Sequence, residues 1–200
     1  PLYGGKGSTW EGGMREPTIA YWPGHIAPHS IDNVPSAFWD WMPTFADLAG
    51  LAPPAQTDGN SLLPTLLHKG VQRSRGYLYM EYNFHETHMQ PASVGVFKRK
   101  GVTGRGQQQA VRIGDFLAIR TQIKHADDPL RLYDVVTDPH EDHNIAGDPA
   151  HAELLHRMTA LLVTARRPDP SAPRPYDDVL LPAVHVKNLK NNQLNRSVYY

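Results

Sequence analysis

Glycine and proline recur along this chain and divide it into short segments. There are 16 glycines and 18 prolines among 200 residues, which favours many turns and short elements over long helices or strands. The densest group is at the start, where five glycines fall within the first 13 residues. Because glycine has no side chain to restrict its backbone, this stretch predicts a tight loop rather than a helix or a strand.

The charge balance and the absence of cysteine exclude several classes of protein. Twenty basic and twenty acidic side chains give a net charge of zero, which argues against nucleic-acid binding because that function needs a basic surface. No apolar run approaches the ~18 residues that cross a membrane, so no membrane span is expected. Without cysteine the chain has no disulfide, thiolate metal site or cysteine-derived nucleophile. Its start lacks an initiator methionine and a signal peptide, which suggests a piece of a longer protein.

Residues 1–75 have the pattern expected for the last segment of a larger α/β layer. Residues 18–22 are β-branched and aromatic and predict a short buried strand. Residues 36–49 predict a helix that is kinked or divided at Pro43 and ended by the glycine that follows. A second, short helix is expected near 60–67.

Residues 76–167 have the composition of a small α+β domain. The pair Gly114-Asp115 between two strand-like segments predicts a hairpin, in which mixed apolar and basic side chains indicate one face in water. The stretch after Pro149 has the clearest helical spacing of apolar residues in the chain and predicts a helix. Five segments have strand composition: 77–82, 93–98, 109–113, 116–122 and 131–136.

Residues 168–200 are expected to form a stiff linker and a poorly ordered tail. Four prolines fall between 168 and 175, and the remainder is polar without a strong period. Together the three parts predict a mixed fold: a terminal α/β segment, then a small antiparallel sheet with one packing helix.

The opening loop is the most informative stretch for function. Consecutive glycine amides around Lys6 predict a cradle for phosphate or sulfate. On composition alone, a glycine-rich turn with a solvated lysine is the alternative. The loop is not a P-loop, because Gly7 follows Lys6 where serine or threonine is required.

The same loop resembles the sulfatase family, and most closely the arylsulfatase A type, in its string GGKGSTWEGGMREP at 4–17. The resemblance covers roughly residues 1–165, because further family motifs follow in order. Several ordered motifs are more specific than one short pattern. They are YWPGHI at 21–26, DWMPT and LAG within 40–50, DGNSLLP at 58–64, VRIGD at 111–115, and LYD and DPHEDHN within 132–144.

The resemblance implies an alkaline-phosphatase-like α/β domain followed by a small C-terminal domain. It implies that the intact enzyme hydrolyses aryl or carbohydrate sulfate monoesters. It also implies a formylglycine nucleophile from a C/S-x-P/A-x-R motif and a calcium ion held by Asp and Asn side chains. This chain lacks that motif, and the Asp-Asn pair is expected upstream of the loop. We therefore assign no metal ligand here and expect the isolated chain to be inactive.

Four residues have roles that the resemblance implies. Lys6 matches a lysine that pairs with a sulfate oxygen on the leaving-group side, where an ammonium stabilises developing charge. Glu11 and Arg15 match family positions and are expected to support the loop as a charge-assisted pair. His125 precedes the LYD motif much as a substrate-contacting histidine does, and a surface histidine is the alternative.

Other functions stay open on the sequence. A related phosphodiesterase or phosphonate hydrolase shares the scaffold, and its upstream nucleophile and metal ligands would distinguish it. A non-catalytic module that binds sulfated polymers is a further alternative, with the basic patch at 98–105 as its contact surface. An α/β layer that is cut leaves an apolar face without neighbours, which favours homo-oligomers. The resemblance favours a periplasmic or secreted protein, while the residues themselves leave the compartment unknown.

Overall fold

The computed structural model describes residues 2–82, 106–167, 169, 171 and 173–177. The chain forms two compact units. We call Pro1–Glu16 with Tyr79–Tyr200 the sheet unit, and Pro17–Leu78 the helical unit. The opening loop therefore belongs to the unit that contains the later strands. The assignment of 1–75, 76–167 and 168–200 to three separate parts stays a prediction.

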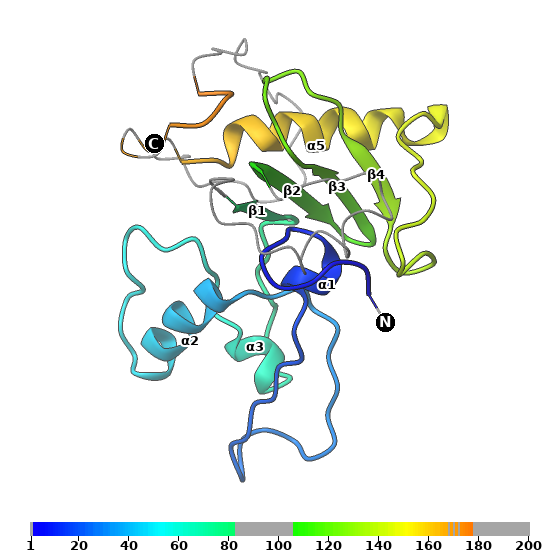
Figure 1. Ribbon diagram of the computed structural model, residues 1–200. Coiled ribbons are helices and arrows are strands. Elements are labelled where there is room, and N and C mark those ends of the chain that lie inside the picture. The colour runs from blue at the N-terminus through cyan, green and yellow to red at the C-terminus, as the bar shows by residue number, and fades with distance from the viewer. Residues whose placement is uncertain (1, 83–105, 168, 170, 172, 178–200) are drawn as a thin grey trace. The chain divides into compact units, whose positions relative to one another are not determined.

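Four strands among the described residues form one sheet in the order β1-β2-β3-β4 (Figure 1). Strand β2 is antiparallel to β3, and β3 is antiparallel to β4. Gly114, with φ of +54°, and Asp115 form the predicted tight turn, because Ile113 pairs with Phe116. The strands are β1 Leu78–Tyr82, β2 Gln108–Ile113, β3 Phe116–Arg120 and β4 Arg131–Asp134. These confirm four of the predicted strands, and the one at 93–98 lies outside the described residues.

Helix α5 covers one face of the sheet (Figure 1). It runs from Ala152 to Thr164 after the 3-10 turn η3, Pro149–His151. The Asp148 carboxylate accepts a hydrogen bond from the Ala150 amide at 2.9 Å and so caps this turn. The predicted packing helix is confirmed, and its buried side chains are Met158, Ala160, Leu161 and Leu162.

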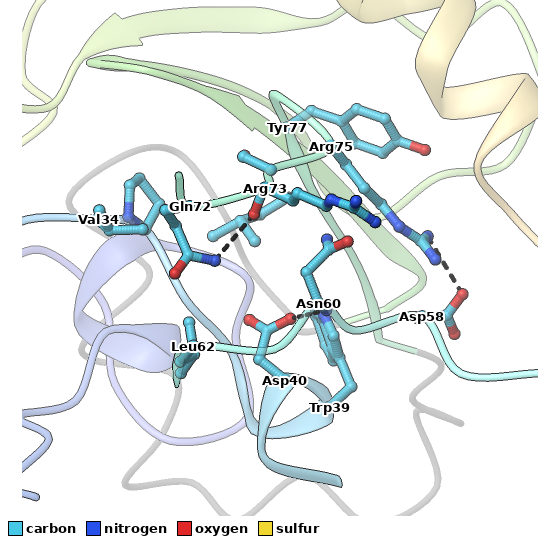
Figure 2. Close-up of a pocket in the computed structure, with 13 residues that line it drawn as sticks. Val34, Trp39, Asp40, Asp58, Asn60, Leu62, Gln72, Arg73, Arg75 and Tyr77 are labelled. Atoms are coloured by element: carbon cyan, nitrogen blue, oxygen red, sulfur yellow. Dashed lines mark hydrogen bonds and ion pairs between the residues drawn. The ribbon is translucent and has the colours of Figure 1, made fainter. Parts of the chain in front are cut away.

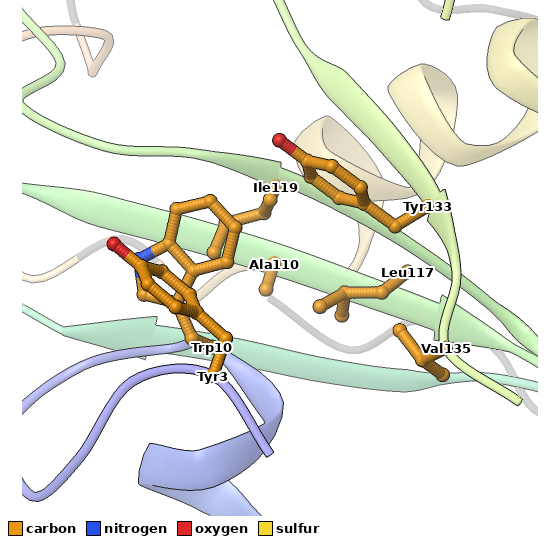
Figure 3. Packing of buried hydrophobic residues seen from close by; sticks show 7 residues of the cluster. All are labelled: Tyr3, Trp10, Ala110, Leu117, Ile119, Tyr133 and Val135. Atoms are coloured by element: carbon orange, nitrogen blue, oxygen red, sulfur yellow. The ribbon is translucent and has the colours of Figure 1, made fainter. Parts of the chain in front are cut away.

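The other face of the sheet carries the aromatic residues of the opening segment. Tyr3 and Trp10 pack there in a buried cluster with sheet residues (Figure 3). The sheet members of this cluster are Ala110, Leu117, Ile119, Tyr133 and Val135. The prediction of a wet face is therefore wrong. Arg120 is only 7% exposed, and its Nε donates to Gln109 Oε1 at 2.9 Å, which satisfies a buried polar group.

The described part of the C-terminal segment is attached to β1 through Glu81. Arg174 Nη1 lies 2.6 Å from Glu81 Oε2, and the Tyr176 hydroxyl donates to Glu81 Oε1. The Tyr79 hydroxyl donates to Oε2 at 2.8 Å. Burial, together with the neighbouring carboxylate, raises the pKa values of both tyrosines above their ordinary value. Of the predicted linker and tail at 168–200, residues 178–200 lie outside the described residues.

The helical unit contains short helices, as its glycine and proline content predicts. They are η1 Phe38–Asp40, α2 Trp41–Leu48 and α3 Leu63–Leu66. Pro43 is the third residue of α2. A proline is tolerated there because the backbone amides of the first helical turn have no partner within the helix. The predicted break therefore lies before Pro43, between η1 and α2, and α2 continues past Pro43. Gly50 follows α2 with φ of +68°, as predicted for a helix end. No helix that the structure describes is long and apolar enough to cross a membrane.

The predicted buried strand at 18–22 is wrong. These residues form no strand, and Ile19 and Tyr21 are 91% and 87% exposed. A β-branched and aromatic composition stabilises a strand through its cross-strand and same-face neighbours, and within the described ranges no strand pairs with this segment.

Candidate active site

Lys6 lies in a loop whose two ends are buried. Tyr3 and Trp10 are 6% and 0% exposed, while Lys6 between them is exposed. The Gly12 amide donates to the Tyr3 carbonyl at 2.7 Å and closes the loop at its base. Within the loop, Gly4 and Gly7 have φ values of +88° and +84°, which side chains other than glycine rarely adopt. The ammonium group is thus presented to solvent from a backbone that is fixed on both sides.

Three of the five glycine amides in the opening stretch are engaged within the protein rather than available for the predicted cradle. The amides of Gly5, Gly12 and Gly13 all donate to acceptors within the protein. Their acceptors are Ser8 Oγ at 3.4 Å, the Tyr3 carbonyl at 2.7 Å and the Trp10 carbonyl at 2.8 Å. The exposed cation of this loop is therefore Lys6, and these three amides shape the loop rather than face an anion.

Strand β2 holds the segment that follows Lys6. Side chains alternate along a strand, so Gln108 and Arg112 share the face of Ala110, on which Trp10 packs. Gln108 Oε1 accepts hydrogen bonds from the Thr9 amide at 3.0 Å and from the Thr9 hydroxyl at 3.2 Å. Gln108 and Thr9 are both buried, so water does not compete for these bonds.

Glu11 is a buried carboxylate with charged partners. It is 4% exposed, and its Oε2 lies 2.5 Å from Arg112 Nη1 and 3.8 Å from Arg15 Nη1. The Glu11 amide donates to Oε1 of the fully buried Glu141 at 3.2 Å. The expected pairing with Arg15 is therefore present, but the Arg15 side chain is 56% exposed against 15% for Arg112. The contact with Arg112 is shorter and less exposed to solvent, so it is the stronger of the two.

Sequence reasoning did not identify Gln108, Arg112 or Glu141 as supports of the loop. They lie from 99 to 130 residues beyond their loop partners, so no local spacing connects them. Two of them lie within quoted motifs, VRIGD and DPHEDHN. Their membership of these motifs was the sequence signal that could have identified Arg112 and Glu141 as supports of the loop.

His125 is exposed in a turn after β3. Oδ2 of Asp128 accepts hydrogen bonds from the amides of Lys124 at 2.6 Å and His125 at 3.1 Å. The bond from the Lys124 amide is the main cause that lowers the pKa of Asp128 below its usual value. The substrate-contacting roles of Lys6 and His125 stay predictions.

A separate hollow lies in the helical unit (Figure 2). It has about 340 Å³ of empty space, part of it open to solvent. Asp40 lines it and accepts hydrogen bonds from the amides of Ala37 at 2.7 Å and Asn60 at 2.8 Å, while Arg75 lies 3.3 Å from Asp58. Both acidic groups are thus already engaged, and none of the four site residues from the sequence lines this hollow.

The residues present do not fit the calcium ion that the resemblance implies. Across the part of the chain that the structure describes, no group of three or more His, Asp or Glu side chains is arranged to hold a metal ion. A calcium ion in a protein takes about 6–8 oxygen ligands, in which Asp and Glu carboxylates supply the negative charge.

Residues 4–103 match the family model described as N-sulphoglucosamine sulphohydrolase, C-terminal. Arylsulfatase A of Homo sapiens is 37% identical over 161 residues, which are 78% of this chain and 31% of that protein. N-acetylgalactosamine-6-sulfatase of Mus musculus is 46% identical over 85 residues, 42% of this chain and 16% of that protein. The chain thus spans a third or less of these two relatives.

The fold has solved counterparts. The crystal structure of Ps i-CgsB covers 79% of this chain and 30% of its own, with a TM-score of 0.59 and 24% identity, a likeness that concerns the fold alone. The family model covers half of the chain and includes the loop that presents Lys6. The chain belongs to the sulfatase family, whose C-terminal region it matches.

Proposed function

We propose that the complete protein containing this chain hydrolyses sulfate monoesters and that Lys6 contacts the sulfate group. The observation that supports this most directly is an exposed lysine on a loop whose flanking aromatic residues are buried in a sheet core. A flexible surface lysine would not need such anchoring. Sulfuric ester hydrolysis is also the activity for which the homologous proteins are named.

Lys6 would act by electrostatic stabilisation. Cleavage of a sulfate ester places negative charge on the sulfate oxygens and on the leaving oxygen, and an ammonium held beside them lowers the energy of that state. Its effect depends on the ammonium being positioned before the reaction, because a group that must first reorganise loses part of its benefit. The two buried ends of the loop supply this positioning.

The nucleophile and the metal are proposed to come from other parts of the complete protein. This chain has no cysteine and no serine in the modification motif, so a formylglycine and calcium ligands would lie outside it. We therefore propose that the 200-residue chain alone does not turn over sulfate esters.

The substrate is proposed to be an aryl or carbohydrate sulfate. Two named relatives act, by their names, on aryl sulfates and on a sulfated amino sugar. His125 is proposed as a further substrate contact. It is exposed, and the turn that carries it is fixed by Asp128.

The test compares Lys6→Ala with the matched variant Lys69→Ala in the complete protein. Both lysines are exposed, but Lys69 lies in the helical unit and outside the opening loop. Sulfate release from an aryl sulfate and from a sulfated N-acetylgalactosamine is measured. Loss of Lys6 should lower kcat about 100-fold or more, while Lys69→Ala keeps wild-type activity.

Three outcomes would each contradict part of the proposal. Wild-type kcat in Lys6→Ala would remove the assigned role of the lysine. Hydrolysis of a phosphodiester or phosphonate ester in preference to every sulfate ester would favour the related hydrolase instead. Turnover by the 200-residue chain above its own Lys6→Ala variant would refute the expected inactivity. The basic patch of the polymer-binding alternative, at 98–105, lies outside the described residues.

Self-association is proposed for the isolated chain. Phe38, Met42 and Phe45 follow one another at spacings of four and three residues and are 82%, 60% and 59% exposed. An apolar stripe of this kind favours contact with a second copy. Sedimentation velocity should show concentration-dependent association that weakens in Met42→Lys, and a monomer at all concentrations would contradict it.

A further inference from the structure

We propose that Arg112 is a positioning residue for Lys6 and acts through the Glu11 carboxylate. The inference deepens the proposed function and rests on it for the role of Lys6. It assigns the support of the loop to a residue on β2, whereas the sequence pattern pointed to Arg15. The two arginines differ in burial and in distance from the same oxygen atom, which makes the proposal testable within one site.

Arg112 is itself held in place by the sheet. Its backbone pairs with Leu117 across β2 and β3, and its Nε donates to the Gly114 carbonyl at 3.0 Å. The Nη1 atom lies 2.5 Å from Glu11 Oε2, and the side chain is 15% exposed. A guanidinium that is fixed at its own hairpin can hold a partner in one position better than a freely rotating side chain.

Glu11 is fixed at both its backbone and its carboxylate. Its amide donates to Glu141 Oε1 at 3.2 Å, and its side chain is 5% exposed in the pair with Arg112. Glu11 starts the short helix α1, Glu11–Met14, directly after Trp10. The position of Glu11 therefore determines where the end of the Lys6 loop lies on the sheet.

Removing the guanidinium should displace this loop end. A buried carboxylate without its cation is costly, and the chain can lower that cost by turning Glu11 toward water. Such a movement acts on residues only five positions from Lys6. A displaced ammonium binds a sulfate group through the same charge but stabilises the transition state less well, so kcat should fall more than KM rises.

Arg15 provides the matched control. It carries the same guanidinium and approaches the same Glu11 oxygen, but at 3.8 Å and with a side chain that is 56% exposed. Exposed pairs of this kind contribute little because water and salt screen them. Replacing Arg15 removes one positive charge near the loop without removing the buried partner of Glu11.

The experiment uses the complete protein with Arg112→Gln, Arg112→Lys and Arg15→Gln. Arg112→Gln should lower kcat about 100-fold with a much smaller change in KM, and Arg112→Lys should recover part of the loss. Arg15→Gln should stay within about twofold of the wild type. Hydrogen exchange should become faster at the Thr9 and Glu11 amides in Arg112→Gln and stay unchanged in Arg15→Gln.

A double-mutant cycle tests whether Arg112 acts through Glu11. If it does, Glu11→Gln combined with Arg112→Gln should lose no more kcat than the worse single variant. Wild-type kcat in folded Arg112→Gln, or equal losses in Arg112→Gln and Arg15→Gln, would overturn the proposal. If Arg112→Gln does not fold, Arg112→Lys decides: a lower kcat in a folded protein supports the proposal, and wild-type kcat overturns it. Full activity in Lys6→Ala would instead refute the proposed function on which it rests.

Discussion

The rings of Tyr3 and Trp10 meet edge to face, with centroids 4.8 Å apart and planes at 89°. Both rings lie against the sheet (Figure 3), where Tyr133 is 5.7 Å from Trp10 and the Arg131 guanidinium lies 4.8 Å above the indole. The two residues that flank the loop of Lys6 are therefore part of the core of the sheet unit. A substitution that destabilises this core should therefore also change the conformation of the Lys6 loop.

Trp10→Ala should destabilise the protein strongly. The side chain is fully buried, and truncation of such a residue costs about 3–5 kcal/mol through lost burial and a cavity. Trp22→Ala is the matched control, because Trp22 is 37% exposed and stacks on His25 outside this cluster. Urea unfolding followed by fluorescence measures both. Equal losses of unfolding free energy in the two variants would show that Trp10 does not anchor the loop.

Gly12→Ala should disrupt the loop, whereas Gly5→Ala should be tolerated. A Cβ at Gly12 would lie 2.5 Å from the Tyr3 carbonyl oxygen and 2.9 Å from that of Gly4, so backbone must move. At Gly5 nothing lies within 4 Å. The expected cost for Gly12→Ala is about 1–3 kcal/mol, as for overpacking, measured by thermal unfolding. A stable Gly12→Ala protein would mean that the loop adopts another path.

Asp128 should make stability depend on acid pH. Its pKa is lowered in the folded protein, mainly by the hydrogen bond from the Lys124 amide. Its contribution is therefore present above the unfolded pKa of about 4 and is lost as the pH falls through the lower, folded value. Asp128→Asn should be less stable than the wild type at pH 7 and should lose less stability on acidification.

The control for this pH effect is Asp127→Asn, which removes an adjacent exposed carboxylate. Its unfolding free energy should follow that of the wild type between pH 7 and pH 3 in urea titrations. An identical acid response in Asp128→Asn and Asp127→Asn would exclude Asp128 as the cap of the His125 turn.

Tyr176→Phe should weaken the attachment of the C-terminal segment. The Tyr176 hydroxyl donates to Glu81 and accepts a hydrogen bond from Gln107 Nε2 at 2.7 Å. Its loss should cost about 1–2 kcal/mol at pH 7. Because the pKa of Tyr176 is raised, the wild type should also lose stability as the pH rises above about 10. Tyr21→Phe, at a position that is 87% exposed, should change neither property.

The sequence predicted the elements whose signals are local. The turn at Gly114-Asp115 and the stripe after Pro149 lead to the observed hairpin and to α5. Residues 18–22 gave a wrong strand because the β-branched and aromatic residues there have no strand partner within the described ranges. In the candidate site, Lys6 is exposed and Glu11 is buried beside Arg15 and Arg112, and the roles that the loop string implies for them stay predictions.

The partners of the loop could not be predicted in the same way. Arg112 belongs to the mixed apolar and basic hairpin segments that predict a sheet face in water, but the Glu11 carboxylate on a distant segment pairs with it and makes its burial possible. The sequence predicts that the glycine amides face an anion, but those of Gly5, Gly12 and Gly13 donate within the opening segment. The first outcome depends on pairing between residues that are far apart in the sequence, whereas the second depends on hydrogen bonds within the opening segment.

The separation between the opening loop and its partners has a consequence for biosynthesis. The contacts from Thr9 to Gln108 and from Glu11 to Glu141 span 99 and 130 residues. On the ribosome the loop emerges before strands β2 to β4, so Trp10 has no sheet to pack against until these strands have been translated. Contacts between residues so far apart in the sequence form slowly, because the intervening chain must form a closed loop before these contacts stabilise the fold. The segment that carries Lys6 should therefore be among the last to become ordered, and nascent chains that stop before Glu141 should leave it open to proteases and chaperones.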